Sequence, residues 1–426
     1  MTMKYSGIEW VGDIPFDWSV MPIRAVFHEI TEKNKYGAEK TALKFTYGNI
    51  VRKNDFDADS DDYVANTILN YTIVDPGTIM INGLNLNFDF VTQRVGLVRE
   101  RGVITSAYLA FRPIDEGTIT ADFATYLFKA YDGCKAFHNM GGGVRKILNF
   151  AELKRNYVIY PNIKKQHEIS DYLDKKCAEI YALAADIQQQ INDIEEYRES
   201  VISLAVTQGV NPDVLMKDSG IDWCPLIPQH WIVTNSKALF ALRNQRASEG
   251  ERQLTASQKL GIVYQDEFME MENQKVVTVE KDFSILKHVE PNDFVISMRS
   301  FQGGLEYSEL SGSISSAYVM LIPNENLVFP PFYRWFFKSS KYINAIQSTT
   351  NLVRDGQAMR YANFVKVPLF IIPIDEQIEI CDYLNGKMRE IDKVISEKKE
   401  QLEILEAFKR AIIFEYVTGK KEVPFI

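Results

Sequence analysis

The feature of this sequence that most restricts its fold is an internal duplication. Residues 6–27 and 219–240 align without a gap and share ten identical residues in 22 positions, two tryptophans among them. Each copy begins with Ser-Gly-Ile-[Glu/Asp]-Trp and continues with Ile-Pro-x-x-Trp. Ordinary composition would give roughly one or two matches. The chain therefore contains two copies of one structural unit.

A second block repeats at a constant offset of 211 residues. Residues 166–173 match residues 377–384, both ending in Asp-Tyr-Leu, and the gap-free match continues to Thr207 and Thr418. Each half thus has the order opening motif, middle region, second block. The middle regions differ strongly although the ends are copied. One chain with two divergent versions of one module suggests two different targets.

The second block of each copy predicts a long amphipathic helix. Apolar residues recur there at spacings of three and four, the pattern of a heptad seam, with Lys398 as one polar break. Pro161 and Pro373 precede the helices, and Gly209 and Gly419 follow them, as start and stop signals should. We expect the two helices to pair as an antiparallel coiled coil that relates the two modules by a pseudo-two-fold axis. The alternative is that each helix packs only on its own module.

The middle regions predict α+β modules. Strand-like runs such as 78–81 and 294–297 are bounded by turn residues, and helices are expected over 123–135 and 331–346. We therefore expect a first module over 1–160, a central helix over 161–210, a second module over 211–372 and a C-terminal helix over 373–426.

Bulk composition excludes several classes of protein. A hydrophobic fraction of 46% supports folded cores, and no run of 18 apolar residues predicts a membrane span. The start of the chain has no signal-peptide pattern, and the four cysteines are scattered, so we expect a cytoplasmic protein with reduced thiols. The net charge of −9 argues against binding nucleic acid through bulk charge alone.

Three places in each module carry side chains suited to a ligand. The first follows a strand and is rich in Asn, Gln and Arg, which read base edges; it comprises Asn82, Asn85, Asn87, Gln93 and Arg94, and in the second module Arg299, Ser300 and Gln302. A polar hairpin loop is the competing interpretation.

The second place combines glycine or polar residues with cations, which suits phosphate contact, or else forms a simple linker. Its residues are Arg145 and Lys146, and in the second module Arg354, Gln357 and Arg360. The third combines polar, basic and aromatic groups near a glycine, where a plain strand edge is the alternative. Its residues are Lys44 and Tyr47, and in the second module Ser257, Lys259 and Tyr264.

Motifs of enzyme chemistry were not found. The sequence has no Gly-x-x-x-x-Gly-Lys-[Ser/Thr] phosphate loop, no Gly-x-Gly-x-x-Gly and no Gly-x-Ser-x-Gly elbow. Its five histidines are isolated, which suggests no metal cluster. We therefore expect no catalytic residues and no metal or cofactor of its own.

The two repeated motifs resemble those of the specificity subunits of type I restriction–modification systems. The opening motif is similar to the start of each target-recognition domain, and Asp-Tyr-Leu before a heptad helix is similar to the two spacer repeats. The resemblance covers essentially the whole chain. It implies a non-catalytic subunit that binds a bipartite sequence in double-stranded DNA and holds two methyltransferase subunits, with restriction motor-nuclease subunits joining them. S-adenosylmethionine, ATP and magnesium would then belong to the partners. A two-headed protein-binding adaptor with a coiled-coil spacer is the alternative function.

Overall fold

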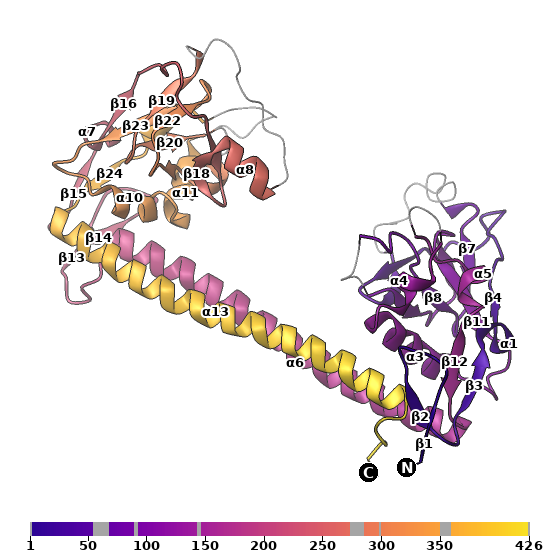
Figure 1. The fold of residues 1–426 in the computed structure, drawn as a ribbon. Coiled ribbons are helices and arrows are strands. Elements are labelled where there is room, and N and C mark those ends of the chain that lie inside the picture. Colours follow the sequence, from indigo (N-terminus) through magenta and orange to yellow (C-terminus); the bar gives the residue numbers. More distant parts are fainter. Residues whose placement is uncertain are drawn as a thin grey trace. The chain divides into compact units, whose positions relative to one another are not determined.

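The computed structural model of this chain describes residues 2–53, 68–88, 93–142, 146–272, 285–297, 300–349 and 359–424. It divides into two units, with residues 1–187 and 399–426 in unit 1 and residues 188–398 in unit 2. Both units combine strands and helices, so the α+β prediction is confirmed (Figure 1). Because α6 (Ile163–Gln208) and α13 (Ile374–Val417) cross the boundary, each long helix contributes to both units.

Unit 1 is organised around a four-stranded antiparallel sheet. Its order is β4 (Phe27–Glu29), β11 (Leu109–Pro113), β8 (Ile79–Ile81) and β9 (Val95–Leu97). The strand predicted at 78–81 is the central β8, and every residue of β8 is buried. Helix α3 (Ala121–Gly133) packs on this sheet through Phe128, whose ring meets Phe27 and Phe111 edge to face.

Short hairpins and helices complete unit 1. The strand pairs are β1 (Met3–Tyr5) with β2 (Asp13–Pro15), β3 (Ser19–Pro22) with β12 (Tyr157–Tyr160), β5 (Leu43–Thr46) with β6 (Asn49–Arg52), and β7 (Thr72–Val74) with β10 (Gly102–Ile104). The short helices are α1 (Ile23–Val26), α4 (Ala136–Met140) and α5 (Phe150–Leu153). In the opening motif, Trp18 is buried and Trp10 meets Tyr131 edge to face, so both tryptophans are packing residues.

Unit 2 repeats this plan. Its sheet has the order β16 (Phe240–Arg243), β23 (Val319–Pro323), β20 (Phe294–Ile296) and β21 (Glu306–Tyr307). The other strand pairs are β13 (Met216–Asp218) with β14 (Leu226–Pro228), β15 (Ile232–Thr234) with β24 (Leu369–Ile371), β17 (Leu254–Ser257) with β18 (Gly261–Tyr264), and β19 (Lys287–Val289) with β22 (Gly312–Ile314). The helices are α7 (Ser236–Leu239), α8 (Gln265–Glu272), α9 (Ser300–Gly303), α10 (Pro330–Phe336), α11 (Ser340–Ser348) and α12 (Tyr361–Lys366).

One helix prediction was wrong in unit 2. The single helix expected over 331–346 is divided into α10 and α11. Ser339 interrupts it with an extended backbone, and its Oγ accepts a hydrogen bond from the N–H of Tyr342 at 3.4 Å. Because Ser339 caps the N-terminus of α11, α10 ends before it and the two helices are separate.

The two long helices pair in an antiparallel manner, as the repeat predicts. In unit 1, Tyr172 on α6 bonds Tyr416 on α13, and Tyr181 bonds Lys409. In unit 2, Gln190 bonds Lys398, and Arg198 forms an ion pair with Asp392. The residue numbers of the partners on α13 decrease as those on α6 increase, which is the pattern of an antiparallel pair. The predicted polar break at Lys398 is thus satisfied inside the seam.

A repeated glutamine fixes each module to the start of its long helix. Gln166 and Gln377 are fully buried, and their Oε1 atoms accept hydrogen bonds from the N–H of Thr120 at 2.9 Å and of Phe329 at 2.8 Å. Each Nε2 also donates to two main-chain carbonyls. A buried side-chain amide needs all of these partners. This requirement gives a physical reason for the repeated glutamine.

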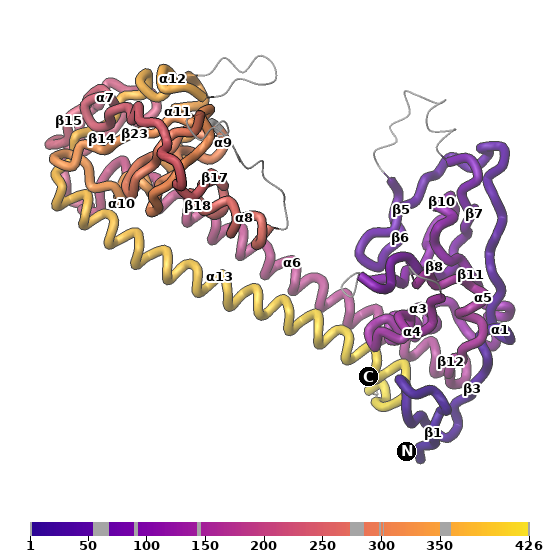
Figure 2. Tube along the Cα trace, turned by 45° about the horizontal axis from the view of Figure 1, so that its top comes forward, coloured from indigo at the N-terminus to yellow at the C-terminus, as the bar shows by residue number. Residues whose placement is uncertain are grey.

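The end of the chain lies in unit 1 beside its beginning (Figure 2). Lys420 Nζ donates to the carbonyl of Val11 at 2.9 Å, and Ile412, Ile413 and Val417 belong to the apolar core of unit 1. In the described part of the chain, no helix combines the length and the apolar content needed to span a membrane.

Candidate nucleic-acid interface

The turn of the β5–β6 hairpin brings two groups of candidate residues together. Tyr47 and Gly48 have φ values of 48° and 75°, the left-handed values that a two-residue hairpin turn requires. Tyr47 is 83% exposed at the tip, and a Cβ at Gly48 would lie 2.8 Å from Gln93 Oε1. The turn therefore rests on Gln93. Lys44 is exposed on β5 of the same hairpin.

A second junction in the first module joins the loop after β8 to the segment after α4. Leu148 N–H donates to the carbonyl of Gly83 at 2.9 Å, and a Cβ at Gly83 would lie 2.3 Å from the Leu148 carbonyl oxygen. Close approach of the two chains thus requires glycine there. Asn85 and Lys146 are exposed on this junction and Asn87 is half-buried. Arg145 lies outside the described residues.

Arg94 has a structural position that the sequence did not indicate. We expected it to contact bases, but it is only 1% exposed. Its Nη1 donates to the carbonyl of Asn82 at 2.9 Å and to the carbonyl of Leu84 at 2.7 Å. Asn82 Oδ1 in turn accepts from the N–H of Leu84 at 3.2 Å. The charged group is therefore used inside the protein, where it holds the loop in shape.

The second module repeats the junction of hairpin turn and strand end. The turn between β17 and β18 lies against α9, where a Cβ at Gly303 would come 3.2 Å from Gln258 Nε2. Two serines stabilise the local turns, since Ser257 Oγ accepts from the N–H of Leu260 and Ser300 Oγ accepts from the N–H of Ser297. Gln302 is exposed on α9.

The other candidates of the second module are dispersed. Lys259 forms an exposed ion pair with Glu272 at 3.3 Å, and the Tyr264 ring lies 3.7 Å from the guanidinium carbon of Arg252. Arg360 is exposed at the start of α12. The candidates Arg299, Arg354 and Gln357 lie outside the described residues.

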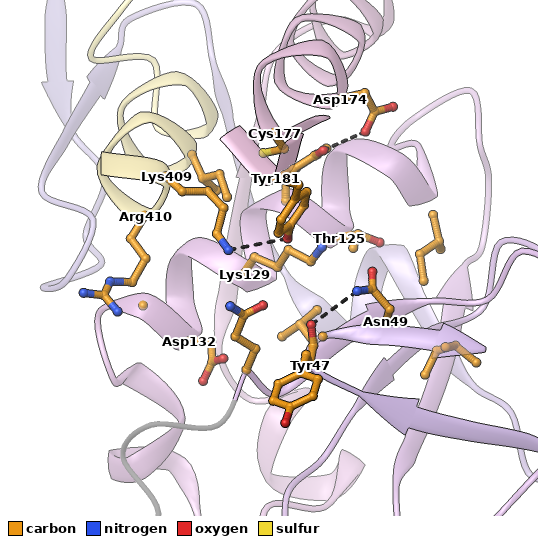
Figure 3. Close-up of a pocket in the computed structure, with 18 of the residues that line it drawn as sticks. Tyr47, Asn49, Thr125, Lys129, Asp132, Asp174, Cys177, Tyr181, Lys409 and Arg410 are labelled. Carbon is orange, nitrogen blue, oxygen red and sulfur yellow. Dashed lines mark hydrogen bonds between the residues drawn. The ribbon is translucent and has the colours of Figure 1, made fainter. Parts of the chain in front are cut away.

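A cleft of about 860 Å³ opens in unit 1 between the hairpin turn, α3 and the paired helices (Figure 3). Its volume lies within the range of roughly 300–1,000 Å³ common for ligand sites. Tyr47 and Gln93 line one side. Lys129 on α3, Tyr181 on α6 and Lys409 on α13 line the other, and the ammonium of Lys409 lies 4.6 Å from the centroid of the Tyr181 ring.

Most polar groups of the cleft are bonded within the protein. Tyr126 Oη donates a hydrogen bond to Asp174 Oδ1 at 2.6 Å. Burial raises the pKa of Tyr126, and this hydrogen bond raises it further. Lys409 Nζ forms an ion pair with Glu406 at 2.6 Å. Lys129 differs, because burial lowers the pKa of its ammonium group. Elsewhere in the described residues, no group of three or more His, Cys, Asp or Glu side chains is arranged to hold a metal ion.

The sequence predictions missed the lysines of this cleft, although one of them carried a signal. Lys409 lies 211 residues after Arg198, so a basic residue interrupts the apolar seam at the same place in both helices. A repeated cation at a seam position indicates a role beyond solubility. Lys129 gave no such signal, because only the fold shows which face of α3 meets the cleft.

Comparison with known proteins places this architecture. Residues 26–193 match the family model of the type I restriction modification DNA specificity domain. The fold is similar to that of a chain in a solved structure of the type I R-M system, with a TM-score of 0.66, 12% identity, and coverage of 96% of this chain and 99% of that chain. The HsdS subunit from Thermoanaerobacter tengcongensis matches with a TM-score of 0.48 at 12% identity, covering 96% of this chain and 98% of its own. Residues 26–193 are therefore similar to the type I restriction modification DNA specificity domain, and over nearly its whole length the chain shares the fold of a chain in a solved structure of a type I R-M system.

Proposed function

We propose that this chain is the DNA-recognition subunit of a type I restriction–modification complex. The observation that carries the proposal is the repeated junction of a hairpin turn with the end of the sheet. The two frames match, but their side chains differ, with Tyr47 and Gln93 in the first module and Gln258 and Gln302 in the second. The family match and the shared fold support the same function.

In this proposal each module reads one half of a bipartite site in double-stranded DNA. The recognition domains are residues 1–160 and 211–372, and the spacer helices are 161–210 and 373–426. Amide side chains suit this task because Asn and Gln can form paired hydrogen bonds with adenine. The chain carries a net charge of −9, so partner subunits supply much of the phosphate contact.

The chemistry in this proposal belongs to the partners. The chain itself is non-catalytic, and two copies of a methyltransferase subunit bind its two related halves. S-adenosylmethionine is bound by the methyltransferases, and ATP and magnesium by restriction motor-nuclease subunits. Native mass spectrometry of the chain with its methyltransferase tests the ratio, and a saturated complex with a single methyltransferase would contradict it.

The recognition proposal is tested by mapping methylated sites. Cells expressing the chain with its methyltransferase should show one split motif, and Asn85→Ala should relax only one half of it. Gln302→Ala should relax only the other half, because each residue belongs to one module. Loss of a base contact costs roughly 1–3 kcal/mol at one position. Relaxation of both halves by either single change, or no motif at all, would refute the proposal.

A further inference from the structure

Lys129 in the first module has an equivalent in the second module, Lys338. Each lies nine residues after the residue whose N–H is bound by the repeated glutamine, Thr120 or Phe329. In the second module, Lys338 Nζ donates to Glu306 Oε1 at 2.5 Å and to the carbonyl of Gly303 at 2.8 Å. Its charge is therefore neutralised inside the protein.

The first module has a glycine where the second has this glutamate. Gly96 on β9 faces Met80 on β8 in the register in which Glu306 on β21 faces Val295 on β20. Among the described residues, Lys129 has no hydrogen bond and no ion pair. Its ammonium lies 5.5 Å from the centroid of the Tyr126 ring, and Cys177 and Asp174 exert a favourable electrostatic effect on it.

The same exchange occurs in the paired helices. Arg198 in unit 2 forms an ion pair with Asp392, whereas the equivalent cation in unit 1, Lys409, faces Tyr181. Tyr181 and Asp392 are 211 residues apart and occupy the same position of the repeat. The first module thus keeps both cations of the second module but lacks both of these carboxylates.

The remaining carboxylates of the cleft do not bind Lys129. Asp132 accepts a hydrogen bond from the N–H of Arg94 at 2.8 Å, and Asp174 accepts one from Tyr126. Asp122 forms an ion pair with Arg99 at 2.8 Å, and Glu406 forms one with Lys409. Arg410, also in the lining, is exposed.

Lys129 and Lys409 repel each other, and of the four carboxylates in the lining only Glu406 forms an ion pair with either lysine, an arrangement that favours an anionic ligand. Burial lowers the pKa of Lys129, and the charge of Lys409 also lowers it, while Cys177 and Asp174 act in the opposite direction; an added anion would further favour the charged lysine. We propose that the cleft lined by Lys129, Tyr181 and Lys409 binds a phosphate ester, that of a DNA strand in the complex proposed above. Phosphate is bound well by lysine, and the tyrosines offer apolar faces to the adjoining sugar or base. The described residues of the second module form no such site, because Glu306 and Asp392 form ion pairs with the equivalent cations, Lys338 and Arg198.

The test compares two variants of the full chain with two matched controls. Lys129→Met removes the cation, and Tyr181→Asp gives Lys409 the carboxylate that unit 2 has. Lys154→Met and Tyr197→Asp make the same chemical changes at exposed positions outside the cleft. The first probe is a mixed-sequence DNA duplex followed by fluorescence anisotropy across salt concentrations, and the second is deoxyadenosine monophosphate followed by calorimetry.

In the duplex experiment, Lys129→Met and Tyr181→Asp should each reduce the slope of log K against log salt by about 0.9, the value for one phosphate contact. Lys129→Arg should keep the wild-type slope, since it keeps the charge, and both controls should keep it too. Loss of monophosphate binding in the two cleft variants, with an unchanged duplex slope, would assign the cleft to a free nucleotide and overturn the DNA-strand assignment.

Because this inference rests on the proposed function, the two can fail separately. If the wild type binds DNA in a salt-dependent manner, but neither Lys129→Met nor Tyr181→Asp changes the binding of the duplex or of the monophosphate, the phosphate site is refuted and the recognition function stands. If the wild type binds no duplex even when it is assembled with its methyltransferase, the recognition function fails. The monophosphate titration then decides the cleft alone, and binding that depends on Lys129 supports the site.

Discussion

Removing Lys338 in the second module should cost far more stability than removing its equivalent, Lys129. The side chain of Glu306 is 4% exposed, so Lys338→Met leaves a buried carboxylate without its cation. Loss of one partner from a fully buried pair costs roughly 3–5 kcal/mol. Because Lys338 is 30% exposed, we expect about 2–3 kcal/mol here, since partial hydration weakens the pair. Lys129→Met breaks no ion pair and removes a cation whose charged form burial disfavours, so it should not destabilise unit 1.

The dependence on pH identifies the cause. Burial raises the pKa of Glu306, against the opposing effect of Lys338, so removing the lysine raises this pKa further. A carboxyl whose pKa is higher in the folded state favours folding at low pH and opposes it at high pH. The loss in Lys338→Met should therefore be complete at pH 7 and should shrink as the pH falls and Glu306 takes up its proton.

The measurement must separate the two units, because they need not unfold together. Pulsed hydrogen exchange across a urea series reports each unit through its own peptides. The double variant Lys338→Met with Glu306→Gln should recover most of the lost stability, since no charge is then buried. A loss in Lys338→Met equal to that in Lys129→Met, or a loss independent of pH, would refute the reasoning.

Three further predictions follow from individual contacts in the structure. Arg94→Met should destabilise unit 1 by about 2–4 kcal/mol in the same urea series, because two buried carbonyls lose a charged donor. Ile180→Asp and Ile391→Asp, at seam positions 8% and 5% exposed, should each lower the melting temperature through an unpaired buried charge, and unchanged melting would contradict the coil. Burial lowers the pKa of His288, but the neighbouring Glu251 at 3.0 Å and Glu290 at 2.7 Å outweigh burial and raise the pKa above 6.5. Unit 2 should therefore lose stability as the pH rises from about 6.5 through this raised value. His288→Gln should make the stability of unit 2 less dependent on pH in that range.

Sequence periodicity predicted the ends of the long helices to within three residues. The heptad seam and the flanking Pro and Gly signals indicated helices near 166–205 and 377–416, and the observed helices are Ile163–Gln208 and Ile374–Val417. Gly209 and Gly419 follow them with φ values of 75° and 70°, where glycine is favoured. These features were predictable because a helix seam depends on residues near one another in sequence.

The candidate interface was less predictable, because its residues come from distant segments. Arg94 looked like a base-reading residue, since nothing in its neighbourhood revealed that the carbonyls of Asn82 and Leu84 would enclose its guanidinium. Lys129 lies in the helix expected over 123–135, and no sequence pattern singled it out. Its unpaired state follows only from aligning Gly96 with Glu306, and that alignment requires the strand register.

The contribution of residues 399–426 to unit 1 has a consequence for how the chain is made. The ribosome completes residues 188–398, a continuous segment that holds all of unit 2, before it adds residues 399–426 of unit 1. Unit 1 needs Ile412, Ile413 and Val417 to close its core, so its 187 N-terminal residues wait with an uncovered apolar face until synthesis reaches the last helix. The first half to be translated is therefore the second half to mature, and during that interval it is the part exposed to chaperones and proteases.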